Sequence, residues 1–89
     1  MQVSNFLSPR SGRAVANQFI ITDNDGVRYF QSYKSIIAKI DKDGKITLDS
    51  YFWDYSATTG KYRNEFLGFG IAETRRRIAS GEILLENLN

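Results

Sequence analysis

The segment Tyr51-Phe52-Trp53-Asp54-Tyr55 decides the fold that the sequence predicts. It contains the only tryptophan of the chain and four aromatic residues in five positions. A buried aromatic side chain removes roughly 150–250 Å² from water, so such a cluster is expected to anchor a small core. Strand-forming residues precede the segment and helix-capping residues follow it. We therefore expect it to join a β-sheet to a helix that packs across the sheet.

Two Asp-x-Asp-Gly segments before this cluster predict two β-hairpins. Each lies between runs rich in β-branched and aromatic residues, and glycine accepts the positive φ that a tight hairpin turn needs. An EF-hand calcium loop does not fit, because alignment on either glycine leaves unsuitable residues at its first and twelfth positions. The turns are residues 23–26 and 41–44, and the predicted strands are residues 19–22, 27–30, 36–40 and 45–48.

Two short helices are predicted after the aromatic cluster, at residues 57–67 and 71–79. Either Asp54 or Ser56 is the expected N-cap of the first helix, since both offer an oxygen to free backbone N–H groups. Residues 82–89 alternate weakly between apolar and polar types and predict a closing edge strand. The expected fold class is α+β: an antiparallel sheet of four to five strands, with both C-terminal helices packed on one face.

The length of 89 residues fits one domain. Residues 1–16 mix turn formers with two arginines and little periodicity. We expect them to form either a flexible arm or a basic arm that closes over a ligand. The apolar fraction of 42% is ordinary for a globular chain and argues against disorder.

Composition narrows the classes of function. The chain has no cysteine and no histidine, which removes disulfides, the commonest metal ligand and the commonest general base. We therefore expect a protein that is not an enzyme and that uses no cofactor or metal. No apolar run is long enough to span a membrane, and the N-terminus lacks a signal-peptide core, so a cytoplasmic location is expected. A net charge of +2 permits an anionic partner.

Two groups of polar and basic residues are candidate anion sites. Free N–H groups and the positive dipole end at a helix start attract anions, and a run of three arginines suits phosphate. The alternative for both groups is ordinary helix capping and a solvated helix face. The first group is Ser56, Thr58, Thr59, Lys61 and Arg63; the second is Arg75, Arg76 and Arg77.

Four tyrosines are candidates for stacking on bases or for contacts with a protein partner: Tyr33, Tyr51, Tyr55 and Tyr62. Tyr33 also forms, with Lys34, a candidate patch between the two hairpins. The carboxylates of Asp49, Asp54 and Glu65 are the remaining candidates for chemistry. No histidine or activated nucleophile supports them, so hydrolysis is not expected.

The hairpin over residues 17–38, the aromatic segment and the helix start Thr58-Thr59-Gly60-Lys61-Tyr62 carry a resemblance. The chain is similar to short proteins of unknown function encoded by bacteriophages and by mobile elements of gut bacteria. The resemblance implies a phage accessory protein that acts in a bacterial host cell by binding a macromolecule. It implies no activity and no functional residues.

The sequence therefore predicts a small non-enzymatic binding module. Its expected target is nucleic acid or a nucleic-acid-handling protein, because residues 61–77 hold five cations against two glutamates and the tyrosines offer stacking faces. One alternative is an inhibitor of a bacterial host or defence enzyme, since exposed Tyr and Arg are typical hot-spot residues. Another is a pocket that sequesters a nucleotide. A homodimer through the edge of the closing strand is also open.

Overall fold

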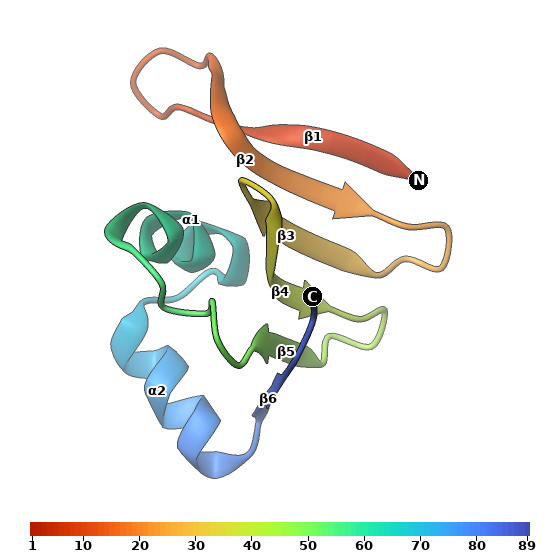
Figure 1. The fold of residues 1–89 in the computed structure, drawn as a ribbon, viewed down its shortest axis with the longest axis vertical. Helices are drawn as coiled ribbons and strands as arrows, with labels where there is room; N and C mark the ends of the chain where they lie inside the picture. Colours follow the sequence, from red (N-terminus) through yellow and green to blue (C-terminus); the bar gives the residue numbers. More distant parts are fainter.

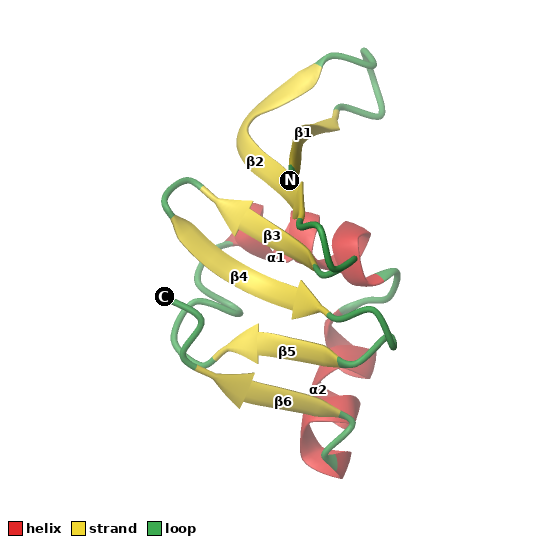
Figure 2. Cartoon of the chain, turned by 90° about the vertical axis from the view of Figure 1, so that its right-hand side faces the viewer, coloured by secondary structure: helices red, strands yellow, loops and turns green.

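A mixed β-sheet with both helices on one of its faces makes up the protein (Figures 1 and 2). The computed structural model describes residues 1–89. Helix α1 contacts β3 and β4, and α2 contacts β6, which leaves the other face of the sheet open. Neither helix is long and apolar enough to cross a membrane. The elements in chain order are β1 (Gln2–Leu7), β2 (Ala14–Thr22), β3 (Arg28–Ser32), β4 (Ser35–Ile40), β5 (Ile46–Asp49), α1 (Ala57–Leu67), α2 (Ile71–Ser80) and β6 (Ile83–Glu86).

Both predicted Asp-x-Asp-Gly turns are confirmed, and the structure shows why these residues form them. In the first, Asp23 Oδ1 accepts hydrogen bonds from the N–H groups of Asp25 and Val27, at 2.8 and 3.1 Å. Asp41 Oδ1 does the same for the second turn, at 2.9 Å to both of its donors. Gly26 and Gly44 adopt φ values of 85° and 86°. The aspartates thus close Asx-turns on the backbone while glycine takes the left-handed position.

The predicted α+β class is confirmed, and β1 to β5 are antiparallel as expected, but the predicted number of strands and the direction of the last strand are wrong. The sheet has six strands in the order β1-β2-β3-β4-β5-β6, and the closing strand runs parallel to β5, from Ile46 opposite Ile83 to Asp49 opposite Glu86. Both helices lie in the connection between these two strands. A crossover of that length returns the chain to the end at which β5 began, so the pairing is parallel.

Residues 1–16, expected as an arm, instead lie mostly in the sheet. Strand β1 pairs antiparallel with β2, from Gln2 opposite Thr22 to Leu7 opposite Ala14. Only residues 8–13 form a loop at its end. Phe6 supplies the buried contact that holds this strand, since its side chain is 4% exposed. The apolar residues of β1 are Val3, Phe6 and Leu7, which do not follow the two-residue alternation by which strands are recognised.

The aromatic centre of the core differs from the one expected. It is made by Phe6, Phe30, Tyr62 and Phe66, whose ring centroids lie 5.3 to 6.0 Å apart in tilted or edge-to-face pairs. Within the segment 51–55, Trp53 and Phe52 are partly buried and pack against this core, as predicted for the tryptophan. Tyr51 and Tyr55 are 73% and 63% exposed. The segment is thus a loop that borders the core and presents two tyrosines to solvent.

Helix α1 begins and ends where the sequence predicts. Ser56 is its N-cap, and the Ser56 Oγ accepts a 3.1 Å hydrogen bond from the N–H of Thr59. Gly68 ends the helix in the left-handed conformation. Helix α2 extends one residue beyond the predicted Ala79 and stops at Gly81.

Candidate functional site

A cleft of about 510 Å³ opens where the β3–β4 turn, the loop before α1 and the first turn of α1 meet. This volume lies within the range of about 300–1,000 Å³ that is usual for small-molecule sites. Three aromatic residues and several hydroxyl groups face it. The lining residues are Asn17, Ser32, Tyr33, Lys34, Ser35, Ile37, Phe52, Tyr55, Ser56 and Thr59.

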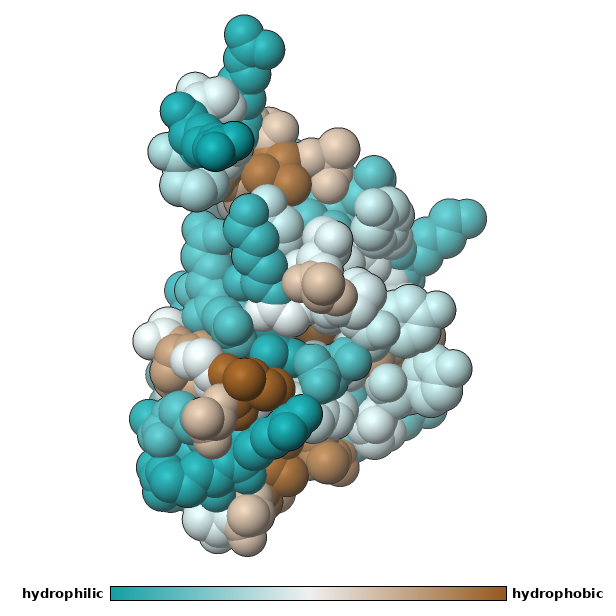
Figure 3. All heavy atoms as spheres, turned by 90° about the vertical axis from the view of Figure 1, so that its left-hand side faces the viewer, coloured by the Kyte–Doolittle hydropathy of each residue, from teal (hydrophilic) through white to brown (hydrophobic).

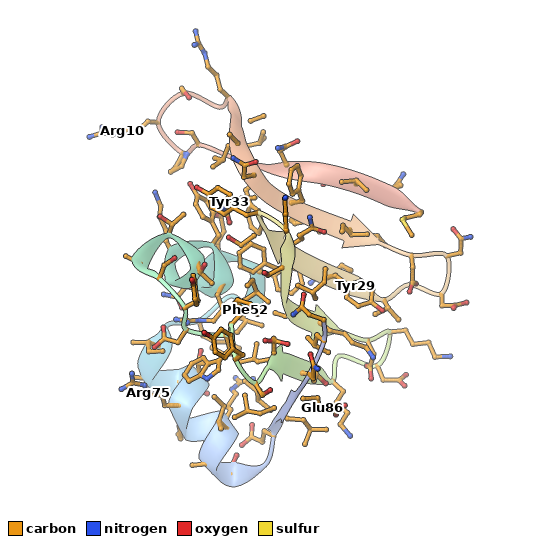
Figure 4. The ribbon with its side chains drawn as sticks, in the orientation of Figure 1. Arg10, Tyr29, Tyr33, Phe52, Arg75 and Glu86 are labelled. Atoms are coloured by element: carbon orange, nitrogen blue, oxygen red, sulfur yellow. The ribbon has the colours of Figure 1, made fainter.

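The aromatic walls of the cleft are largely open to solvent. Tyr33 and Tyr55 are 60% and 63% exposed, so their ring faces are available to a ligand. Phe52 meets Tyr55 edge to face, with ring centroids 5.3 Å apart. Figure 4 shows Tyr33 near the start of α1 and Phe52 below it, on the side of the molecule that carries the helices. Flat rings exposed in a concave site are suited to stacking on another aromatic group.

The backbone beside the cleft is strained at two positions. Asn17 and Tyr33 are the only non-glycine residues with positive φ, at 64° and 55°. Their backbones meet, because the N–H of Tyr33 donates a 2.7 Å hydrogen bond to the Asn17 carbonyl. A bulky residue in the left-handed region costs about 1–2 kcal/mol relative to the right-handed one. Strain of this kind concentrates at ligand-binding positions, where it fixes the direction of a side chain.

Buried polar groups form the floor of the cleft. The Ser56 hydroxyl donates to Thr59 Oγ1 at 3.1 Å, and Thr59 Oγ1 lies 3.5 Å from Ser32 Oγ. Ser32 and Thr59 are 5% and 3% exposed. Gln18, which pairs with Ser32 across the strands, is also buried, and its Oε1 has no hydrogen-bond partner. A ligand in this cleft would therefore meet hydroxyl groups below its aromatic walls.

Charge is distributed unequally between the two ends of the sheet. Because β1 to β5 alternate in direction, the β1–β2 loop and the β3–β4 turn lie at the cleft end, and the two Asp-x-Asp-Gly turns lie at the other (Figure 1). The β1–β2 loop and the β3–β4 turn contain Arg10, Arg13 and Lys34 and no carboxylate, and the loop before α1 at the same end contains Asp54. The β2–β3 and β4–β5 connections at the far end contain four aspartates and two lysines. Viewed from the helix side, hydrophilic atoms project at the top and apolar patches are small and separate (Figure 3). The cleft therefore lies at the more positive end.

Of the predicted helix-start residues, Ser56 and Thr59 line the cleft. Thr58 and Lys61 are exposed on α1 outside it, and the Lys61 ammonium lies 5.3 Å from the centroid of the Tyr62 ring. Arg63 was predicted as an anion contact, and this prediction is wrong. Its side chain is only 2% exposed.

Arg63 instead connects α1 to the loop that precedes it. One guanidinium nitrogen donates to the Trp53 carbonyl and to Asp54 Oδ1, both at 2.9 Å, and the other donates to Asn64 Oδ1 at 3.0 Å. The guanidinium also lies over the Trp53 ring, 5.4 Å from its centroid. A planar group with several fixed donors suits this position, which makes Arg63 a structural residue of the cleft wall.

The three consecutive arginines differ in their contacts within the chain, and their role as phosphate contacts stays a prediction. Arg76 binds both carboxylate oxygens of Glu73, at 2.8 and 2.7 Å, and Arg77 binds the same carboxylate at 2.8 Å. The Arg77 guanidinium also lies 4.2 Å from the centroid of the Phe69 ring. Hydrogen bonds from Arg76 and Arg77 lower the pKa of Glu73 to about 2, so its carboxylate stays ionised at neutral pH. Arg75 and Arg76 are both largely exposed, and Arg75 lies 3.7 Å from Asp54 Oδ2.

The predicted tyrosines divide into three kinds. Tyr33 and Tyr55 line the cleft, and Tyr51 is exposed next to it, with its ring centroid 4.7 Å from that of Phe52. Tyr62 was predicted to offer a stacking face, but it is 6% exposed and packs against Phe6 in the core. The spacing that places Tyr62 on the same helix face as Phe66 was the signal for burial.

The carboxylates Asp49, Asp54 and Glu65 are not assembled into a pair. Asp49 is 1% exposed and accepts hydrogen bonds from the N–H groups of Tyr51, Phe52 and Leu88 and from the Asn89 side chain. Burial by itself would raise the pKa of Asp49, but these hydrogen bonds outweigh it and hold the pKa below its usual value. Asp49 therefore fixes the aromatic loop and the C-terminal residues to the end of β5.

Sequence reasoning missed part of the cleft. Asn17, Ser32 and Phe52 were not identified as candidates. The polar turn Ser32-Tyr33-Lys34-Ser35 was the available signal, because a tight turn without glycine between strands implies a residue held in a strained conformation.

The chain belongs to a family whose function is unknown. The family model described as "Family of unknown function (DUF8033)" matches residues 1–83, so the chain is a member of that family. No curated protein and no solved structure matches the chain. These comparisons contain nothing that indicates a bacteriophage or gut-bacterial origin, and that part of the resemblance stays a prediction.

Proposed function

We propose that this protein is a non-enzymatic binding module whose cleft takes a nucleobase together with its phosphate, as part of a nucleic acid or of a free nucleotide. The observation that carries the proposal is the pairing of exposed tyrosine rings, Tyr33 and Tyr55, with the cation Lys34 in one concave site. Stacking of a base on an aromatic side chain contributes about 1–3 kcal/mol and tolerates any base. A planar, anionic ligand matches both features at once.

The distribution of charge supports a phosphate rather than a neutral aromatic group. Arg10 and Arg13 lie in the β1–β2 loop at the cleft end, and neither forms an ion pair within the chain. The start of α1 borders the cleft at Ser56 and Thr59, and its first N–H groups point toward the N-terminal end of the helix. An anion at the cleft would therefore be attracted both by the N–H groups at the start of α1 and by the unpaired arginines of the β1–β2 loop.

The groups that remain near the cleft favour binding over catalysis. The Ser56 hydroxyl is occupied as a helix cap and as a donor to Thr59. Asp54 is engaged by Arg63, and Asp49 is saturated by backbone donors. Because no unengaged base stands within reach of a hydroxyl, activation of a nucleophile has no candidate residues here.

The setting of the proposal comes from the sequence resemblance alone: a phage accessory protein in the cytoplasm of a bacterial host. The alternative of an inhibitor of a host or defence enzyme relies on exposed Tyr and Arg. Tyr51 and Tyr55 are exposed on the loop before α1, and Arg75 is exposed on α2. An inhibitor is therefore one of the outcomes that the test distinguishes.

The proposal is tested by measuring the melting temperature and the affinity with nucleotides and oligonucleotides at low salt. A ligand that binds the native state raises the melting temperature, and the affinity for an oligonucleotide should fall as salt increases because counterions are released. Lys34→Ala should weaken binding, while Lys42→Ala, at the opposite end of the sheet, is the matched control. If no nucleotide or oligonucleotide raises the melting temperature and the protein instead captures a host enzyme, the alternative function as an enzyme inhibitor is favoured.

A further inference from the structure

We infer that the ligand is a single-stranded oligonucleotide that continues on both sides of the cleft, toward Tyr51 on one side and toward the β1–β2 loop on the other. This inference rests on the proposed function, because it specifies the ligand of the same cleft. It goes beyond that function by separating single strands from mononucleotides and from duplexes.

Tyr51 provides a stacking face outside the cleft. Its side chain is 73% exposed and is not part of the lining, yet its ring meets Phe52 edge to face at 4.7 Å. The backbone around it is held in place, since the N–H groups of Tyr51 and Phe52 donate to Asp49 Oδ2 at 3.1 and 2.8 Å. A positioned, exposed ring one residue from the cleft wall can stack on the next base of a strand.

The β1–β2 loop provides unpaired cations on the other side of the cleft. Hydrogen bonds from the Ser8 N–H to the Arg13 carbonyl and from the Gly12 N–H to the Ser8 carbonyl, both 2.8 Å, close this loop on itself. Arg10 and Arg13 project from it without a carboxylate partner. Figure 4 shows Arg10, Tyr33 and Phe52 following one another along the long axis of the molecule. A backbone that leaves the cleft past Tyr33 would bring its phosphates to these arginines.

A duplex does not suit this arrangement. Bases in a duplex are stacked on one another and present only their edges, whereas Tyr33, Tyr51 and Tyr55 offer ring faces. A mononucleotide would use the cleft but would leave Tyr51 without a role and would bring only its own phosphate to the loop arginines. A single strand uses all three features.

The test compares four probes against the full chain at low salt: thymidine monophosphate, a thymidine dinucleotide, a longer oligothymidylate and a duplex. We expect the affinity for the oligothymidylate to exceed that for the mononucleotide by about tenfold or more, because one further base stacks on Tyr51. The duplex should bind more weakly than the oligothymidylate.

Variants separate the inference from the proposed function. Tyr51→Ala should leave the mononucleotide affinity unchanged and lower that of the oligothymidylate by about tenfold. The double variant Arg10→Ala with Arg13→Ala should lower the affinity for the oligothymidylate by a larger factor than the affinity for the mononucleotide, because only the longer ligand brings further phosphates to the loop. The double variant should also reduce the slope of log affinity against log salt by about 1.4, at about 0.7 for each lost phosphate contact. Tyr55→Ala should weaken both ligands.

Three outcomes are informative. Equal affinities for mononucleotide and oligothymidylate, both insensitive to Tyr51→Ala, would overturn the inference and leave the proposed function standing. Duplex binding as tight as single-strand binding would also overturn it. Failure of every probe to bind would contradict the proposed function itself.

Discussion

The backbone N–H of Tyr33 donates a 2.7 Å hydrogen bond to the carbonyl of Asn17, and these two are the only non-glycine residues in the chain with positive φ. The contact joins the β3–β4 turn to β2 at the edge of the cleft. Both residues line that cleft. The fold thus holds an exposed tyrosine at a turn position that glycine occupies with less strain.

Replacing Tyr33 by glycine should separate stability from binding. The Tyr33→Gly variant removes the strain, and the exposed ring contributes little to the core, so we expect it to be more stable than Tyr33→Ala by about 1 kcal/mol. Both variants should lose affinity for nucleotides to the same extent. Urea unfolding and a binding titration on the two variants measure these effects. An alanine variant as stable as the glycine variant would show that the turn carries no strain.

Arg63→Met should destabilise the fold rather than only weaken anion binding. The substitution removes hydrogen bonds to the Trp53 carbonyl and to Asp54, and the loss of buried charged hydrogen bonds costs about 1.5–3 kcal/mol each before relaxation. We expect a lower denaturant midpoint in urea. The exposed neighbour Lys61 supplies the control, since Lys61→Met should change the unfolding free energy by no more than about 0.5 kcal/mol. Equal effects of the two substitutions would contradict the structural role of Arg63.

Asp49→Asn should reduce stability in a pH-dependent way. At neutral pH the amide cannot accept all the N–H donors that surround Asp49, so we expect a loss of about 1–3 kcal/mol. Because the folded-state pKa of Asp49 lies below its unfolded value, its stabilisation is complete above about pH 4 and is lost as the pH falls further. The difference in unfolding free energy between wild type and Asp49→Asn should therefore become smaller as the pH falls.

Chemical unfolding of both proteins between neutral pH and about pH 2 measures that difference across the range over which model carboxyl groups titrate. Asp43→Asn is the control, because the Asp43 side chain forms no hydrogen bond within the chain. If the difference in unfolding free energy between wild type and Asp49→Asn stays constant across the whole pH range, titration of the Asp49 carboxylate is not its source.

Substitution of Arg76 should have almost no effect on oligonucleotide binding, in contrast to substitution of Lys34. Arg76 is held by Glu73 on both oxygens and lies 3.5 Å from Glu82, so its charge is already balanced. Arg76→Ala should leave oligonucleotide affinity within about twofold, which corresponds to less than 0.5 kcal/mol. The informative comparison is Lys34→Ala, measured in the same titration. A tenfold loss from Arg76→Ala alone would move the binding surface to α2.

The sequence predicted the features that local chemistry determines. Asp23, Gly26, Asp41 and Gly44 specify their turns through side-chain hydrogen bonds and positive φ, and Ser56 and Gly68 mark the two ends of α1. All of these contacts lie within a few residues along the chain. Propensity and capping rules act over that range, so they located the hairpins and the helices.

Features that depend on distant residues were not predictable in the same way. The partner that buries Arg63 is Asp54, nine residues earlier and in a loop, and the contact that recruits β1 is Phe6 against Phe30. Strand β6 runs parallel to β5 because α1 and α2, which connect the two strands, return the chain to the end of the sheet where β5 begins. The cleft itself combines β2, the β3–β4 turn and the loop before α1. Its full lining therefore emerges only when the sheet is assembled.

The most direct test of the central claim is a titration of isotope-labelled protein with a short oligothymidylate at low salt, followed by backbone N–H chemical shifts. The proposal predicts saturable shifts at Asn17, Tyr33, Tyr55 and Ser56, with the far turns at Asp25 and Asp43 unaffected. Shifts that are absent, or that are confined to α2 and the far turns, would contradict the assignment of the cleft as the nucleotide-binding site.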